Sequence, residues 1–519
     1  MAVMVRTRVS GARDGGRRGL MEALHNAEGD GTHVLESSNA GPAALRGSAL
    51  RVAGYGAGLL LALISAPLLL RYLGQVEFGR YFTVISIVTI VSGLTEGGLN
   101  IIATREYTTR SGADRAAVMS NLMGMRITLS LVGGLVAVGF AAVAGYGEVL
   151  VLGTALASVG MVLQLTQSMA VVPLQSALRF GWATAVDLLR QAVSVVLIVT
   201  LVLLGAELLP FFAITIPAGI IGLVITLILV RRFASLRPNL DVLSWTPLLR
   251  DAAIFGVAIA VNTVYFRITV ILMSFLATPL ETGYFSTSFQ VIAVLVGLPA
   301  LTIASAFPIL TRAAEGNLER LRAASTRILE LSIIAGAWVM VTVQVGSDWI
   351  VHLLGGAAAI PAAPVLRMQA VAVLATFVTF ACATTLMSAG RYRVILIINV
   401  VGLLLSMGLA LLLIPRLEAM GAAVAAVAAE GFLAVASVAV LWATADRVRP
   451  GKGVLIAAAA ACTVAGAAGW LLRDHSLVAT VVASSTYLIV LAVSRQLPPE
   501  VRHLFDVRAF RTARGGGGA

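Results

Sequence analysis

The stretch Val52-Ala-Gly-Tyr-Gly-Ala-Gly-Leu-Leu-Leu-Ala-Leu-Ile-Ser-Ala-Pro-Leu-Leu-Leu70 carries no charge and lies between Arg51 and Arg71. Its length is close to the roughly 20 residues with which an α-helix crosses a bilayer. Similar apolar runs recur along the chain. They predict fourteen membrane spans, near residues 51–70, 81–103, 117–144, 149–172, 182–204, 209–230, 251–277, 284–310, 325–353, 364–388, 394–415, 420–444, 453–472 and 476–494.

The composition of the 519-residue chain is that of a membrane protein. Apolar residues make up 59% of it and charged residues only 12%, whereas a typical soluble domain has about 25% charged residues. Because so few charges could not cover the surface of a soluble enzyme, we predict an all-α polytopic membrane protein. Cys382 and Cys462 both lie in apolar runs, so no disulfide framework is expected. No cofactor or metal motif is found in the sequence.

The net charge of +12 is explained by membrane topology. If the N-terminal tail is cytoplasmic, 29 of the 37 basic residues fall in cytoplasmic tails and loops and four in spans, which leaves four outside, Arg71, Arg80, Arg416 and Arg473. The positive-inside rule predicts this asymmetry, so we expect a cell-membrane protein with both termini in the cytoplasm. The arginines lie mostly at the edges of apolar runs without interleaved aromatic residues, so no nucleic-acid partner is expected.

Two pairs of short segments indicate an internal repeat. Glu77-Phe-Gly-Arg-Tyr-Phe-Thr83 is similar to Glu281-Thr-Gly-Tyr-Phe-Ser-Thr287 at an offset of 204 residues, and Leu174–Phe180 to Leu386–Tyr392 at an offset of 212. The nearly equal offsets predict that spans 1–6 and 7–12 form two pseudo-symmetric lobes, with two extra C-terminal spans. The predicted parts are a disordered cytoplasmic tail at 1–46, an N-lobe at 47–231, a cytoplasmic inter-lobe linker at 232–250, a C-lobe at 251–446, spans 13 and 14 at 447–495, and a cytoplasmic basic, glycine-rich tail at 496–519.

Over residues 47–445 the chain resembles the polysaccharide-flippase branch of the multidrug/oligosaccharidyl-lipid/polysaccharide exporter superfamily. The clearest motif is Arg71-Tyr-Leu-Gly-Gln-Val-Glu-Phe-Gly79, which is similar to the family's Leu-Gly-x-x-x-Phe/Tyr-Gly loop. Glu96-Gly-Gly-Leu-Asn100 and Gly421-Ala-Ala-Val support it. The chain departs from the family at Thr269, where an acidic residue is frequent. The resemblance implies a transporter of lipid-linked glycans.

Arginines within spans are candidates for binding a lipid diphosphate, because the planar guanidinium pairs with phosphate oxygens. Arg267 is the main candidate, since it lies about sixteen residues, roughly 24 Å, into span 7, with Asn262 and Tyr265 one turn earlier. The alternatives are that it snorkels to the interface or pairs with an acid. Arg126 in span 3 and Arg51 at the inner mouth of span 1 are further candidates, with snorkelling and topology anchoring as their alternatives.

Two acidic residues are candidates for coupling transport to an ion. Glu430 lies near the middle of span 12, either as a protonatable site or as the partner of a buried arginine. Glu96 lies deep in span 2 beside Gly97 and Gly98, where close helix packing is expected. For Glu96 the alternative is a structural hydrogen bond.

We therefore predict a non-enzymatic transporter that flips a polyprenyl-diphosphate-linked oligosaccharide or polysaccharide precursor from the cytoplasmic to the external leaflet by alternating access. Its expected partners are the lipid-linked glycan, membrane lipid and, by family analogy, glycosyltransferases or a polymerase of the same pathway. One alternative is a cation-coupled drug or metabolite antiporter of the same superfamily, with Glu96 and Glu430 binding the cation. A membrane glycosyltransferase or polymerase is a remote alternative. Such enzymes usually need a sizeable loop outside the membrane for their chemistry, and no connection between spans is longer than Arg231–Arg250.

Overall fold

The structure is a computed structural model that describes residues 40–177, 179–231, 237–241, 244–316, 318–443 and 448–494. These residues form α-helices and one 3-10 helix and contain no strand, which confirms the predicted all-α fold. Most of the predicted tail at 1–46 and all of the tail at 496–519 lie outside them. The helices are α2 (Ala40–Glu96), α3 (Leu99–Thr109), α4 (Gly112–Val143), α5 (Glu148–Ala170), α6 (Val172–Ser176), α7 (Phe180–Leu203), α8 (Leu208–Ala213), α9 (Thr215–Val230), α10 (Trp245–Leu276), α11 (Pro279–Gly316), α12 (Leu318–Gly355), η2 (Ala357–Ala362), α13 (Ala363–Ser388), α14 (Tyr392–Ala443), α15 (Lys452–Leu471) and α16 (Ser476–Val493).

Within the described residues, twelve helical segments are long and apolar enough to cross a membrane. Two of them contain a non-helical residue, Gly74 in α2 and Glu418 in α14. A straight helix of the 52 residues of α14 would be about 78 Å long, more than twice the roughly 30 Å hydrocarbon core. Instead α14 folds back at Glu418, so that Gly402 packs against Leu433. Each broken segment contains two of the predicted spans, and fourteen crossings remains the predicted number.

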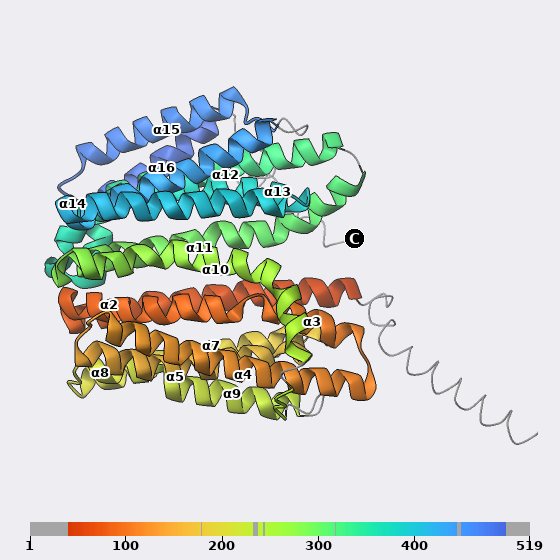
Figure 1. Ribbon diagram of the computed structural model, residues 1–519. Coiled ribbons are helices and arrows are strands. Elements are labelled where there is room, and N and C mark those ends of the chain that lie inside the picture. Colours follow the sequence, from red (N-terminus) through yellow and green to blue (C-terminus); the bar gives the residue numbers. More distant parts are fainter. Residues whose placement is uncertain are drawn as a thin grey trace, which may run out of the picture.

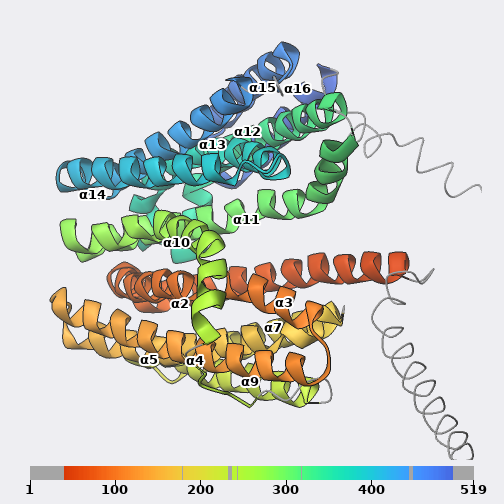
Figure 2. The same cartoon turned by 45° about the vertical axis from the view of Figure 1, so that its right-hand side comes forward.

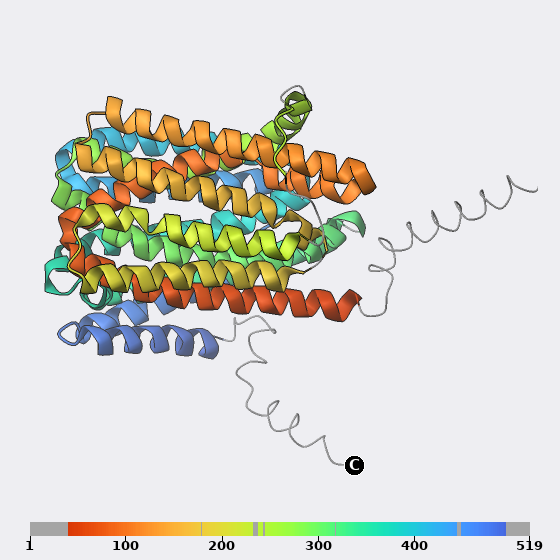
Figure 3. The same ribbon diagram turned by 90° about the horizontal axis from the view of Figure 1, so that it is seen from below.

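The helices are arranged in two halves (Figure 1). Helices α2 to α9 lie on one side, helices α10 to α16 lie on the other, and α2 faces α10 and α11 between them (Figure 1). The helices of the first half run side by side (Figure 3). Glycines permit close approach there, since a Cβ added to Gly54 would lie 2.1 Å from Thr184 of α7. The division of the chain into two lobes and their pseudo-symmetry stay predictions.

The connection between the halves is docked on the first half. The indole nitrogen of Trp245, at the start of α10, donates a hydrogen bond to Asn121 Oδ1 of α4 at 2.7 Å. The backbone N–H of Asn239 donates to the carbonyl oxygen of Ser120 at 3.0 Å. Helix α10 therefore begins before residue 251, where span 7 is predicted to start, and its first turns cross from one half to the other (Figure 2).

The last two helices, α15 and α16, lie at the edge of the bundle and pack on α12 (Figure 1). The hydroxyl of Tyr487 donates to the backbone oxygen of Ile334 at 2.9 Å. The indole nitrogen of Trp338 donates to Ser484 Oγ at 2.9 Å. These contacts attach the predicted extra spans to the second half.

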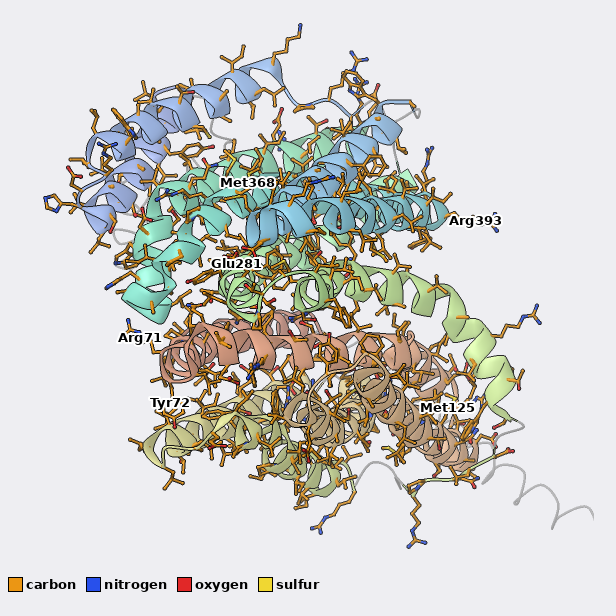
Figure 4. The ribbon with its side chains drawn as sticks, turned by 60° about the vertical axis from the view of Figure 1, so that its left-hand side comes forward. Arg71, Tyr72, Met125, Glu281, Met368 and Arg393 are labelled. Atoms are coloured by element: carbon orange, nitrogen blue, oxygen red, sulfur yellow. The ribbon has the colours of Figure 1, made fainter. Side chains whose placement is uncertain are left out.

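The two halves are joined at the end of the bundle that carries Arg71, called here the Arg71 end. Arg71 of α2 donates to the backbone oxygen of Leu353 at the end of α12, 2.8 Å away. Arg71 and Arg393 lie at opposite ends of the bundle (Figure 4). The predicted topology places Arg71 outside the cell and Arg393 in the cytoplasm, which stays a prediction.

Near the Arg71 end, α2 and α11 approach each other at two glycines, Gly79 and Gly283. A Cβ added to Gly79 would lie 2.8 Å from the backbone nitrogen of Gly283, and one added to Gly283 would lie 2.1 Å from the backbone oxygen of Gln75. Thr287 Oγ1 also donates to Gln75 Oε1 at 2.9 Å. Gly79 and Gly283 hold equivalent positions in the predicted repeat.

Candidate substrate-binding cavity

A cavity of about 210 Å³ lies among α10, α11, α13 and α14 of the second half. Its wall is mostly aromatic and aliphatic with a few polar groups, a combination typical of ligand sites. The polar lining residues are Arg267, Thr269, Gln369, Thr376, Ser406 and Glu430. Three of the predicted site residues, Tyr265, Arg267 and Glu430, are therefore brought together.

Arg267 of α10 lies where this cavity meets the first half. The central carbon of its guanidinium is 5.3 Å from the ring centre of Phe82 on α2 and 5.6 Å from that of Phe289 on α11. The cation thus contacts aromatic rings from both halves. Its Nη1 atom is buried and has no hydrogen-bond partner among the described residues. Because a buried charge is costly unless it is paired, this arrangement suits an anion that binds from outside the protein.

Glu430 of α14 is buried, and each of its carboxylate oxygens has a hydroxyl neighbour at 2.9 Å. The hydroxyl of Tyr265 donates to one oxygen. Thr376 Oγ1 lies beside the other oxygen and equally close to the backbone oxygen of Ala372, so these two acceptors share its single hydrogen. These bonds connect α10, α13 and α14. Glu430 was predicted to be either a protonatable site or the partner of a buried arginine. The partners observed are hydroxyl groups and not an arginine.

A second cavity, of about 90 Å³, adjoins the first. Tyr265, Thr376 and Glu430 line both and so form the wall between them. Asn262 lines the second cavity together with Asn399. The structure therefore separates Asn262 from the cavity that contains Arg267.

Arg126 lies in the first half, away from both cavities, and is fully buried. Its guanidinium donates hydrogen bonds of 3.2–3.3 Å to four oxygens, those of the Leu165 and Thr95 backbones and of the Asn100 and Ser168 side chains. Because these hydrogen bonds occupy the guanidinium, Arg126 stabilises the packing of α2, α4 and α5.

Glu96 belongs to the same network. It accepts a hydrogen bond of 2.9 Å from Asn100 Nδ2, and α2 ends at Glu96 because Gly97 and Gly98 have φ values of 43° and 74°. The predicted close packing is present, since a Cβ added to Gly256 of α10 would lie 2.7 Å from the Gly97 oxygen. Helix ends leave carbonyl groups unpaired, and Arg126 satisfies one of them.

Arg51 lies in α2, but its side chain is outside the described part of the structure, so its predicted role stays a prediction. The prediction missed Phe82, Phe289 and Gln369. A single ring or amide within an apolar span carries no sequence signal of its own, because hydropathy does not show which helix face lines a cavity.

This arrangement of helices is similar to that of several solved transporters. The structure titled lipid II flippase MurJ, in an inward closed conformation, is similar with a TM-score of 0.71 and 12% identity, over 85% of this chain and 98% of that one. An inward-facing multidrug resistance MATE family transporter is similar with a TM-score of 0.62 and 13% identity, over 73% and 92%. A MOP superfamily transporter from Pyrococcus furiosus gives a TM-score of 0.56 and 15% identity, over 76% and 93%. At these identities the likeness shows the fold.

The chain belongs to the family described as polysaccharide biosynthesis protein, whose model matches residues 44–314. This match confirms the family resemblance seen in the sequence. No curated protein matches the chain.

Proposed function

We propose that this protein flips a polyprenyl-diphosphate-linked oligosaccharide or polysaccharide precursor from the cytoplasmic to the external leaflet by alternating access. The observation that carries this proposal is the buried guanidinium of Arg267, whose Nη1 is unpartnered among the described residues of the cavity wall. A guanidinium binds phosphate oxygens through two parallel N–H donors and keeps its charge when buried. The polysaccharide biosynthesis family and the fold shared with a lipid II flippase support the proposal.

In this conformation the two halves are in contact at the Arg71 end, which supports entry of the substrate headgroup from the opposite end of the bundle. Four phenylalanine rings pack in a row that includes the two rings beside Arg267, with centre distances of 5.8 Å for Phe78 and Phe82, 5.9 Å for Phe82 and Phe289, and 6.0 Å for Phe285 and Phe289. The cavity of about 210 Å³ is smaller than the roughly 300–1,000 Å³ of most ligand sites. Transport therefore requires the helices around this cavity to separate around the headgroup, and the two halves to separate at the Arg71 end.

Glu430 is our proposed site for ion coupling. Protonation would turn one of its acceptor oxygens into a donor, which reverses the direction of the hydrogen bond with Tyr265 or that with Thr376. Because these bonds connect three helices around the cavity, the protonation state of Glu430 would change the hydrogen bonding among these helices. Glu96 does not connect helices around the cavity, because its hydrogen bond lies within the first half.

The test is the leaflet location of lipid-linked glycans in cells depleted of the protein. We expect them to accumulate in the cytoplasmic leaflet and to be restored by the wild type but not by Arg267→Gln. Arg473→Gln is a matched control, because Arg473 stacks on Trp470 outside the cavity, and it should restore export. If depletion leaves every lipid-linked glycan in place, the flippase proposal is wrong.

A cation-coupled antiporter is the second candidate, favoured by a buried carboxylate in the cavity wall and by the similarity to MATE transporters. We prefer the flippase because both oxygens of Glu430 already accept hydrogen bonds and Arg267 would repel a cationic drug. Efflux of ethidium that is abolished by Glu430→Gln and unaffected by Arg267→Gln would favour the antiporter.

The cellular setting follows from the same proposal. We place the protein in the cell membrane with both termini in the cytoplasm, because the arginine distribution follows the positive-inside rule. Glycosyltransferases or a polymerase of the same pathway are the proposed partners. Tags on the two termini, tested for protease accessibility in intact cells, check this orientation.

A further inference from the structure

Gln369 of α13 is a second polar residue in the wall of the cavity that contains Arg267. Its side chain is 3% exposed, and its Oε1 atom is buried with no hydrogen-bond partner among the described residues. It lines the same cavity as Arg267 and Glu430. Most buried polar atoms in proteins are hydrogen-bonded, so an unpaired amide in a cavity wall indicates a ligand group that is absent from the protein itself.

The polar groups of this cavity differ in their partners. Glu430, Tyr265 and Thr376 are neighbours at 2.9 Å. Arg267 Nη1 and Gln369 Oε1 are buried and find no partner in the described part of the chain. Besides the hydroxyls of Thr269 and Ser406, the wall thus offers one cationic donor and one neutral carboxamide, which can both accept and donate hydrogen bonds.

We propose that Gln369 is a specificity-determining residue that hydrogen-bonds the sugar attached directly to the diphosphate, through a hydroxyl or acetamido group of that sugar. The inference rests on the proposed function, because it requires Arg267 to hold the diphosphate. A ligand complementary to Arg267 and Gln369 carries an anion and a neutral polar group close together, as a glycosyl diphosphate does. Gln369 and Arg267 line the same cavity, so the group that Gln369 contacts is the sugar next to the diphosphate.

The experiment measures binding of two probes to the purified full-length protein in detergent, by calorimetry. The probes are farnesyl diphosphate and farnesyl-diphosphate-linked N-acetylglucosamine. Because the bare diphosphate carries extra negative charge, the informative quantity is the effect of each substitution on each probe. Gln369→Met keeps the length of the side chain and removes its hydrogen-bonding atoms.

We expect Gln369→Met to weaken binding of the glycosylated probe by about three- to tenfold, the value of one neutral hydrogen bond, and to leave farnesyl diphosphate unaffected. Gln167→Met in α5 is the matched control. Gln167 is also 3% exposed with an unpartnered Oε1 among the described residues, but it does not line this cavity. It should change neither probe. If Gln369→Met does not fold, Gln369→Asn, which withdraws the carboxamide by one methylene, should show the same selective loss.

The two proposals fail in different ways. If Arg267→Gln weakens both probes while the Gln369 variants change neither or change both equally, the role of Gln369 is wrong and the flippase proposal stands. If neither probe binds the wild type, or Arg267→Gln leaves both affinities unchanged, the diphosphate site itself is wrong.

Discussion

Replacing Gly283 by alanine should open the Arg71 end of the bundle. The added Cβ would lie 2.1 Å from the backbone oxygen of Gln75 and 2.7 Å from its carbonyl carbon. Backbone atoms cannot rotate away as a flexible side chain can, so α2 and α11 must separate by about 1–1.5 Å before the contact reaches van der Waals distance. The same movement lengthens the hydrogen bond of 2.9 Å between Thr287 and Gln75.

The expected magnitude follows from the cost of adding a methyl group to a packed site, about 1–3 kcal/mol. The cost applies to the conformation that is closed at the Arg71 end and not to one in which the helices have separated. It therefore shifts the ratio of closed to open molecules by about 5- to 150-fold. Gly408→Ala in α14 is the control, because a Cβ there would have no atom within 4 Å.

The assay uses a chain in which Cys382 and Cys462 are replaced by alanine and Ala293, a cavity-lining residue, is replaced by cysteine. A membrane-impermeant maleimide is added outside intact cells, and the labelling rate is measured. We expect labelling at least about fivefold faster with Gly283→Ala and unchanged with Gly408→Ala. If the Gly283→Ala protein has wild-type abundance and melting temperature but an unchanged labelling rate, the contact of Gly283 with α2 does not close the external side.

Three further substitutions test the roles of the buried charges. Arg267→Gln should weaken binding of farnesyl diphosphate by about 10- to 150-fold, the value of a charge-assisted hydrogen bond, and a smaller change in calorimetry would place the anion elsewhere. Arg126→Leu should lower the melting temperature, because each buried acceptor left unpaired costs about 1–3 kcal/mol, whereas the same change at Arg473 should not. Glu430→Gln should keep the wild-type melting temperature, since an amide can still bond both hydroxyls, but should remove the pH dependence of transport in proteoliposomes. A pH profile identical to that of the wild type would exclude Glu430 as the coupling site.

The fold class was predictable because the bilayer imposes it on the sequence. Uncharged runs such as Val52–Leu70 must be helical and must span, and the family motif Arg71–Gly79 lies where the halves are joined. The start of α10 was not predictable, because Trp245 extends the helix through a hydrogen bond to Asn121 on another helix. Hydropathy contains no information on such a contact.

The cavity was only partly predictable for a similar reason. Arg126 and Arg267 have the same signal in the sequence, a single charge within an apolar span. Their neighbours differ, because Arg126 has four oxygen acceptors and Arg267 has two aromatic rings and an unpartnered Nη1 among the described residues. Which oxygens surround a guanidinium depends on how helices rotate and pack, and this is decided by contacts distant in sequence.

The contrast between Arg126 and Arg267 also indicates that the two halves have different roles. At the predicted offset of 204 residues Arg267 corresponds to Leu63, and at the predicted offset of 212 residues Gln369 corresponds to Ala157. Neither of these side chains can bind a phosphate or a sugar. The predicted repeat would therefore include the Gly79–Gly283 contact but not the chemistry of the cavity. An unpaired cation within a membrane is costly, and Arg267 has no hydrogen-bond partner for its Nη1 among the described residues where the second half meets Phe82 of the first. An anion that binds there would draw the guanidinium from the rings of both halves, so binding of the headgroup and separation of the halves would be one event.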